Sequence, residues 1–162
     1  MANIGQHPEK EPKNQVSDYD AMDEYRDFSA RNPNGLRLVA EPCGADKRLA
    51  LSSDAGDFGK WLQQKDPSMN IETQKHEVLI DRHSVDIWLG LVNIGGNIAL
   101  TVFLNLVSSY LYDKTRGALR GDRSQVHLTV VYTDFKDGTC KKLIFEGDVD
   151  ALKKLVEELR RG

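Results

Sequence analysis

The chain contains little cysteine, and its cysteines do not form a recognisable motif. Its 162 residues include only two, Cys43 and Cys140, and neither belongs to a CxxC pair. The spacing argues against a disulfide framework or a zinc ribbon and favours a reducing compartment. The amino-terminal residues also lack the apolar stretch of a secretion signal. We therefore expect a cytoplasmic protein.

A strong excess of charge is also missing. The formal net charge is -3, with 29% charged and 40% hydrophobic residues. These values are typical of a soluble globular domain and indicate no broad attraction to nucleic acid or to anionic lipid. The length allows one domain with a sizeable core.

Motifs for catalysis, metal binding or cofactors are lacking as well. His76, His83 and His127 are not placed at metal-ligand spacing, and the glycines of NIGGN do not form a G-x-G-x-x-G fingerprint. No Ser-His-Asp set or pair of carboxylates stands out. We therefore predict no catalytic, metal or cofactor residue, and a protein that is not an enzyme.

The most distinctive feature present is a long uncharged run. No charged residue lies between Asp86 and Asp113. On a helix with 100° between residues, the polar side chains of this run gather on one face, and the rest of the circumference is apolar. A buried amide requires a hydrogen-bond partner. This face is therefore a predicted interaction surface, with the residues Asn93, Asn97, Thr101, Asn105 and Ser108.

Three interpretations of residues 87–112 stay open. The run can be the core helix of a soluble domain, with its polar stripe partly in water. It can be a helix dedicated to oligomerisation. As a third alternative, it exceeds the roughly 20 apolar residues that cross a bilayer, which predicts a single-pass inner-membrane protein with a cytoplasmic carboxy-terminal domain. Gly95 and Gly96 predict close packing or a break in the helix.

A short basic connection follows this run. It is a second candidate contact surface, with Lys114, Arg116, Arg120 and Arg123. Asp113 and Asp122 dilute its charge, and no aromatic residues are interleaved. Nucleic-acid binding is therefore not expected, because stacking aromatics and unopposed positive charge are its usual signs.

The organisation predicted along the chain is a tail, a short helix and one domain. Residues 1–16 are polar and predict a flexible tail. Residues 17–34 predict a short helix capped by Ser17 and a turn at NPNG. Residues 35–162 predict a single α+β domain, in which a small sheet is packed by the long apolar helix and by a carboxy-terminal amphipathic helix.

The carboxy-terminal part carries the clearest local signals. VHLTVVYTDF and TCKKLIFEG flank an Asp-Gly turn, which predicts a β-hairpin. After it, Asp148 is placed to cap a helix. The apolar residues of this helix recur at the spacing of one helical face: Leu152, Leu155, Val156 and Leu159.

The order of these segments is similar to that of a known domain family. It comprises the strand LRLVAEP, the helix DFGKWLQQ, the apolar LVNIGGNIALTVFLNLVSSYL, the basic residues and the final hairpin and helix. Over residues 36–160 this pattern resembles the effector-associated constant component domains of bacterial conflict and immune systems. The resemblance implies an adaptor that couples a sensor or effector to a protein partner, and it implies no catalytic residue. We accordingly expect a non-enzymatic interaction module that forms homo-oligomers through the central helix.

Overall fold

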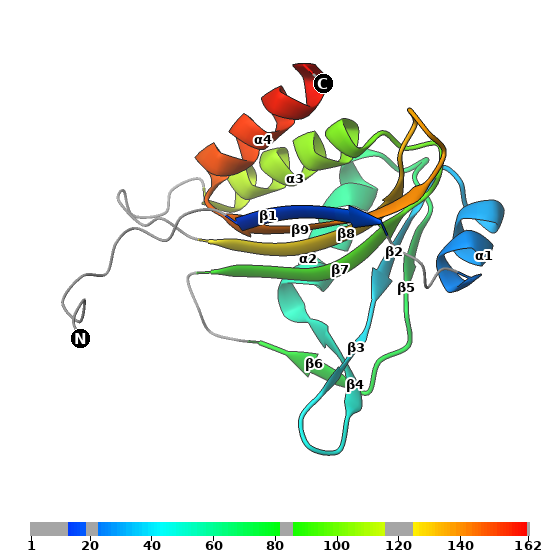
Figure 1. Cartoon of the computed structure of the whole chain (residues 1–162). Helices are drawn as coiled ribbons and strands as arrows, with labels where there is room; N and C mark the ends of the chain where they lie inside the picture. Colours follow the sequence, from blue (N-terminus) through cyan, green and yellow to red (C-terminus); the bar gives the residue numbers. More distant parts are fainter. Residues whose placement is uncertain (1–12, 19–22, 82–85, 116–124, 162) are drawn as a thin grey trace, which may run out of the picture.

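The computed structural model describes residues 13–18, 23–81, 86–115 and 125–161. It confirms the α+β class (Figure 1). The strands are β1 (Lys13–Asp18), β2 (Leu36–Val39), β3 (Glu41–Cys43), β4 (Arg48–Ser52), β5 (Ile71–Thr73), β6 (Val78–Ile80), β7 (Ile87–Ile94), β8 (Val126–Thr133) and β9 (Cys140–Gly147). The helices are α1 (Asp23–Arg31), α2 (Ser53–Lys65), α3 (Leu100–Thr115) and α4 (Val149–Arg161).

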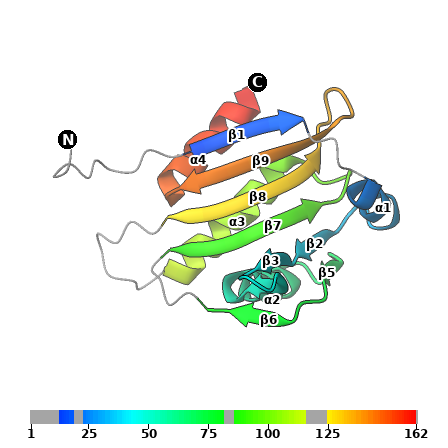
Figure 2. The same cartoon turned by 60° about the horizontal axis from the view of Figure 1, so that its bottom comes forward.

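The strands form two sheets. The main sheet has six strands in the order β1-β9-β8-β7-β2-β5, and the small sheet has the order β3-β4-β6. β7 and β8 are parallel neighbours, and α3 connects them in the chain. Helices α3 and α4 lie against one face of the main sheet, whereas the small sheet projects beyond its other face (Figures 1 and 2). The face of the main sheet away from α3 and α4 is only partly covered, because Tyr25 and Phe28 of α1 form a small buried cluster with Val131 of β8.

The single helix expected over residues 87–112 is wrong in its first half. Ile87–Ile94 is strand β7, and the helix begins only at Leu100. The strand is apolar on both faces, with Leu89 and Val92 in the core and Trp88 and Leu91 partly buried on the other side. Gly95 and Gly96 follow the strand, so the glycine pair marks the break. Among the described residues, no helix combines the length and the apolar character needed to cross a membrane.

The flexible tail predicted over residues 1–16 is wrong for its last four residues. Residues 13–16 belong to β1, which pairs antiparallel with β9 in a register that sets Lys13 opposite Glu146. Ser17 lies in the same strand and caps no helix, because α1 begins at Asp23. A strand that contributes backbone hydrogen bonds to a sheet edge needs few apolar side chains, which explains why its polar sequence gave no signal. Residues 1–12 lie outside the described residues.

The predicted hairpin and final helix are confirmed. β8 and β9 pair antiparallel in continuous register from Val126 opposite Gly147 to Thr133 opposite Cys140. Asp148 Oδ1 accepts a hydrogen bond of 2.8 Å from the backbone N–H of Ala151, which is the expected cap of α4. Leu152, Leu155 and Val156 are buried against α3 and the sheet, and Leu159 packs against this core.

The core beneath the helices is built around aromatic side chains from α2 and α3. Phe58 is fully buried, and its ring centroid lies 6.0 Å from that of Phe103 and 5.1 Å from that of Tyr110, with edge-to-face geometry in both pairs. Trp61 completes the group at 5.6 Å from Tyr110. Such contacts add to the gain from apolar burial and fix α2 against α3.

Two loops meet where β7 ends, at the junction that positions the start of α3. The backbone N–H of Gly95 donates to the carbonyl of Gly35 over 2.9 Å, and that of Asn97 donates to the carbonyl of Pro33 over 2.9 Å. A Cβ on Gly95 would lie 2.4 Å from the carbonyl oxygens of Asn32 and Pro33. The loops therefore approach more closely than any residue with a side chain allows.

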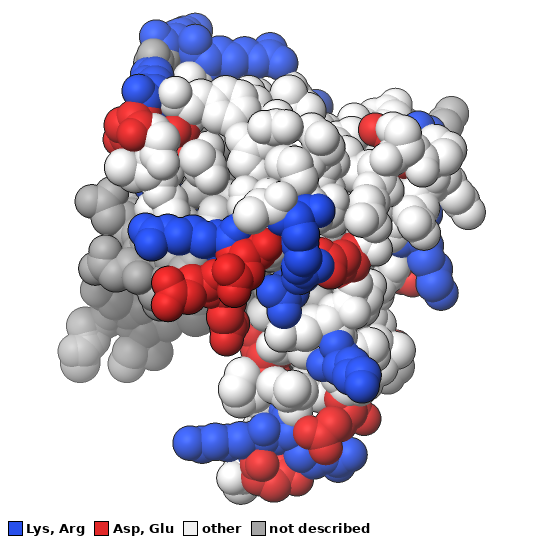
Figure 3. Space-filling view, turned by 90° about the vertical axis from the view of Figure 1, so that its right-hand side faces the viewer, with Lys and Arg blue, Asp and Glu red and all other residues white. Residues whose placement is uncertain are grey.

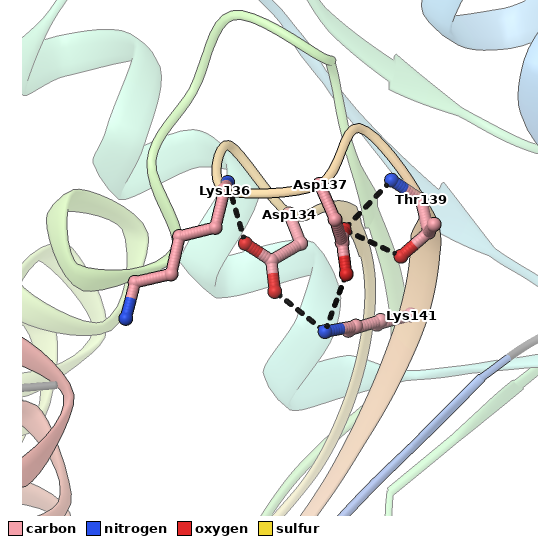
Figure 4. Close-up of polar contacts among 5 residues, drawn as sticks. All are labelled: Asp134, Lys136, Asp137, Thr139 and Lys141. Carbon is pink, nitrogen blue, oxygen red and sulfur yellow. Dashed lines mark hydrogen bonds and ion pairs between the residues drawn. The ribbon is translucent and has the colours of Figure 1, made fainter.

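The tip of the β8–β9 hairpin is held by one lysine and two aspartates (Figure 4). Lys141 Nζ lies 2.6 Å from Asp134 Oδ2 and 3.3 Å from Asp137 Oδ2. Thr139 donates to Asp137 Oδ1 from its hydroxyl over 2.7 Å and from its backbone N–H over 3.0 Å. These Thr139 hydrogen bonds, with support from Lys141, lower the pKa of Asp137 to about 2.

We expect Asp137→Asn to remove part of the pH dependence of folding. A carboxyl with a depressed pKa stabilises the fold above its unfolded pKa of about 4, and this contribution is lost as the pH falls towards about 2. The urea midpoint of Asp137→Asn should therefore lie below that of the wild type at pH above about 4, and the two should converge at lower pH. A constant difference across this range would contradict the assignment.

Candidate functional site

A groove runs along α3 on the helical face. It has a volume of about 740 Å³ and lies between the antiparallel helices α3 and α4, with α2 beside it. From α3 it is lined by Asn105, Leu106, Ser108, Ser109, Tyr112 and Asp113; from α4 by Lys153, Val156, Glu157 and Arg160; and from α2 by Trp61 and Lys65. A volume of this size lies within the range of pockets that bind ligands or partner side chains.

A buried hydroxyl in this groove has no partner among the described residues. Ser108 is 9% exposed, and its Oγ makes no hydrogen bond there. An unsatisfied buried polar group costs about 1–3 kcal/mol, so such groups usually mark a site where a partner or water supplies the missing bond. Ser108 lines the groove, but its Oγ exposes less than 1 Å², so a group in the groove reaches the hydroxyl only if the side chain rotates.

Apolar side chains also lie on the outer side of α3. Val102 is 53% exposed and Tyr112 is 63% exposed, and Leu106 is partly buried between them along the helix. Exposed apolar side chains that occur singly are normal on proteins, but a row on one helix beside a groove is typical of a contact surface.

The end of the groove near the last turns of α3 is fixed by polar contacts to α2. Trp61 Nε1 donates to Asp113 Oδ2 over 2.9 Å, and Lys65 Nζ lies 3.7 Å from the same oxygen. Lys65 also sits 5.6 Å above the Trp61 ring. Burial, together with the charges of Asp57 and Asp54, raises the pKa of the neighbouring Tyr110, which stays protonated. This end of the groove is therefore preformed.

The predicted polar stripe is only partly assembled by the fold. Asn105 and Ser108 line the groove, and Thr101 lies half-buried one turn earlier on α3. Asn93 lies in β7 and is 8% exposed, so it belongs to the sheet. Asn97 is exposed in the loop before α3, where its Nδ2 donates to Asn34 Oδ1 over 3.2 Å. The correction follows from the strand, which removes Asn93 and Asn97 from the helix.

Of the predicted basic surface, only Lys114 falls within the described part of the chain. Its Nζ lies 3.3 Å from Asp57 Oδ2, so it joins α3 to α2. Arg116, Arg120 and Arg123 lie outside the described residues.

Sequence patterns did not identify the other walls of the groove. Lys153, Val156, Glu157 and Arg160 come from α4, and Trp61 and Lys65 come from α2. Their spacing indicates ordinary amphipathic helices, and only tertiary packing brings them to α3.

The charges near this region are mixed in sign. In Figure 3, basic side chains gather at the top, and a broad uncharged surface lies below them. A band of acidic and basic side chains crosses the middle of the same view. The surface in this view thus offers uncharged area next to charges of both signs.

Comparison with known proteins gave no match. No protein-family model, no curated protein and no solved structure is similar to this chain at a significant level.

Proposed function

We propose that this chain is a non-enzymatic interaction module that self-associates through the groove along α3. The observation that carries the proposal is the buried hydroxyl of Ser108, which has no hydrogen-bond partner among the described residues, beside the partly buried Leu106 and the exposed Tyr112. A second protein surface would supply a hydrogen-bond partner for the hydroxyl, and it would also cover the apolar side chains.

The charges of the groove favour a second copy as the partner. Its walls carry Lys153 and Arg160 together with Glu157 and Asp113. In a two-fold symmetric contact, each patch meets itself, so a patch with both signs can place acids opposite bases. A serine hydroxyl both donates and accepts, and the Asn105 amide does the same, so these groups are suited to pairing across such an axis.

The expected role of the dimer is that of an adaptor. As the resemblance to effector-associated domains implies, self-association would bring together protein partners that each copy carries. The partner in this proposal is a protein, such as an effector or sensor, and no cofactor takes part.

Replacing Tyr112 with lysine is expected to disrupt self-association without unfolding the protein. Tyr112 is 63% exposed, so the substitution costs little folding free energy, while it places a charge in the apolar part of the contact. Sedimentation velocity over a concentration series should show the wild type shifting towards dimer and Tyr112→Lys remaining monomeric.

The matched control for this experiment is Phe135→Lys. Phe135 is another aromatic residue, 60% exposed, between the end of β8 and the start of β9. This variant should self-associate like the wild type. A wild type that stays monomeric at millimolar concentration, or equal effects of the two variants, would contradict the proposal.

Ser108→Ala provides a second test. Removing an unsatisfied hydroxyl should leave stability unchanged or increase it, because alanine requires no hydrogen bond. The same change should weaken self-association, because the hydroxyl no longer pairs across the interface. An unaltered dimer in Ser108→Ala would show that Ser108 lies outside the contact.

A further inference from the structure

A second cavity lies on the opposite side of the main sheet from α3 and α4. It has a volume of about 330 Å³ and is enclosed between the open face of β7, β8 and β9 and the strands β3 and β4 of the small sheet. Figure 2 shows this open face of the sheet from the side away from the helices. The cavity shares no lining residue with the groove along α3. It is at the small end of the range for ligand pockets, which fits a single side chain or small molecule.

Stacked aromatic rings form part of the cavity wall. The ring centroids of Trp88 and His127 are 3.7 Å apart, with 8° between the ring planes. The register of β7 against β8 shifts between Trp88 and Gly90, and Gly90 has φ of 68°. The backbone N–H of Trp88 donates to Asp54 Oδ2 of α2 over 2.9 Å. The bulge and this hydrogen bond fix the direction in which the indole ring projects, as bulges beside functional sites commonly do.

The charged groups of the cavity are carboxylates. Glu41 and Glu146 line it, and none of its described lining residues is a lysine or arginine. Glu41 Oε1 would lie 3.5 Å from a Cβ on Gly90, which places this carboxylate over β7. Glu146 is on β9, its side chain is 43% exposed, and its Oε1 lies 3.4 Å from His127 Nδ1. Both carboxylates are therefore accessible from the cavity.

The imidazole of His127 does not neutralise all of the negative charge of these carboxylates. Its Nε2 lies 3.1 Å from Asp86 Oδ2, so a carboxylate also stands on its other side. Among the described residues that line the cavity, the imidazole of His127 is the single group that can carry a positive charge, against the two carboxylates of Glu146 and Glu41. The field of these described groups therefore favours a cation.

We propose that this cavity binds a guanidinium group, as carried by an arginine side chain. Guanidinium is planar, stacks on aromatic rings and pairs with carboxylates through parallel N–H···O bonds. The cavity combines both features, because the Trp88–His127 stack is flanked by carboxylates on β3 and β9. A compact ammonium can also lie over an aromatic ring, but it cannot stack flat on the ring or form the parallel pair of N–H···O bonds. This site goes beyond the proposed self-association and depends on none of its residues.

The test is a titration of the full-length protein followed by NMR of the tryptophan indole N–H groups. The chain has two tryptophans, and Trp61 lies on the helical side as an internal control. Acetyl-arginine methylamide should shift the Trp88 indole signal with saturation in the millimolar range, while the Trp61 signal remains in place. Acetyl-citrulline methylamide has nearly the same shape without the charge and should cause no saturable shift. Agmatine tests a free guanidinium: tighter binding of the peptide-like probe identifies a side chain as the source, and tighter binding of agmatine identifies a small molecule.

Two substitutions complete the test. Glu41→Gln and Glu146→Gln remove one carboxylate charge each and should each weaken binding of the arginine probe about tenfold, since each removes one charge-assisted contact. Lys60→Gln, a charge change at an exposed position of α2 outside the cavity, should bind as the wild type does. Equal shifts with the arginine and citrulline probes, no Trp88 shift at all, or unchanged binding in both glutamine variants would overturn the proposal. None of these outcomes bears on the dimer, which sedimentation measures separately.

Discussion

Gly95→Ala is expected to destabilise the protein more than any other single methyl addition considered. The new Cβ would lie 2.4 Å from the carbonyl oxygens of Asn32 and Pro33, and both are backbone atoms that cannot rotate away. Relief requires the two loops to separate, which breaks the hydrogen bonds from Gly95 to Gly35 and from Asn97 to Pro33. Overpacking of this kind costs typically about 1–3 kcal/mol, and the lost hydrogen bonds add about 1 kcal/mol each. We expect a loss of about 3–5 kcal/mol in the free energy of unfolding, measured by urea denaturation.

Gly56→Ala is the matched control for this prediction. A Cβ on Gly56 would meet nothing within 4 Å, and Gly56 lies inside α2. Alanine favours a helix over glycine by about 1 kcal/mol, so this variant should be slightly more stable than the wild type. If Gly95→Ala proved as stable as Gly56→Ala, the close contact of the two loops would be wrong.

The second large effect is expected for Phe58→Ala. Phe58 has no exposed surface and contacts the aromatic rings of Trp61, Phe103 and Tyr110. Its removal leaves a cavity between α2 and α3, and truncation of a buried phenylalanine costs about 3–5 kcal/mol. A marginally stable domain loses most of its folded population at this cost. Urea denaturation followed by circular dichroism measures the change.

Phe135→Ala makes the same chemical change at an exposed position. Phe135 is 60% exposed at the hairpin tip, so its truncation should alter the free energy of unfolding by no more than about 0.5 kcal/mol. A comparable loss in both variants would mean that burial does not determine the cost. The pair thus tests whether the α2–α3 aromatic contact is part of the core.

The parts of the fold that could be predicted are those with local signals. The Asp-Gly turn specified the β8–β9 hairpin, and Gly138 indeed has φ of 72° there. The apolar spacing of Leu152, Leu155 and Val156 specified α4, which Asp148 caps as expected. In each case the preferences of residues within a few positions of one another are sufficient to predict the element, without knowledge of distant contacts.

β7 could not be predicted, because both of its faces are apolar. A strand with one wet face alternates in polarity, whereas IWLGLVNI does not, and its hydrophobicity merges with that of α3. β1 failed for the opposite reason, since KNQVSD has almost no apolar residue and its place depends on the edge of β9. Both strands are defined by their neighbours in space.

The candidate sites follow the same division. Helical periodicity predicts that Asn105 and Ser108 share a face, because both lie on α3. The residues that α4 contributes to the groove can be identified only from the folded structure. The stacked Trp88 and His127 are 39 positions apart and are brought together by the pairing of β7 with β8. A contact between parallel strands leaves no local pattern in a single sequence.

The pairing of β1 with β9 has a consequence for the order of folding. The first strand of the main sheet bonds to the last one, so Lys13 lies opposite Glu146. During synthesis, β1 leaves the ribosome long before β9 has been made. Pairing of the two strands then closes a loop that contains most of the chain. Closing so long a loop is entropically costly, and a sheet rich in such distant contacts folds slowly. We expect β1 to be the last strand to acquire amide protection from hydrogen exchange during refolding, after β7, β8 and β9 have formed a sheet on which it can assemble.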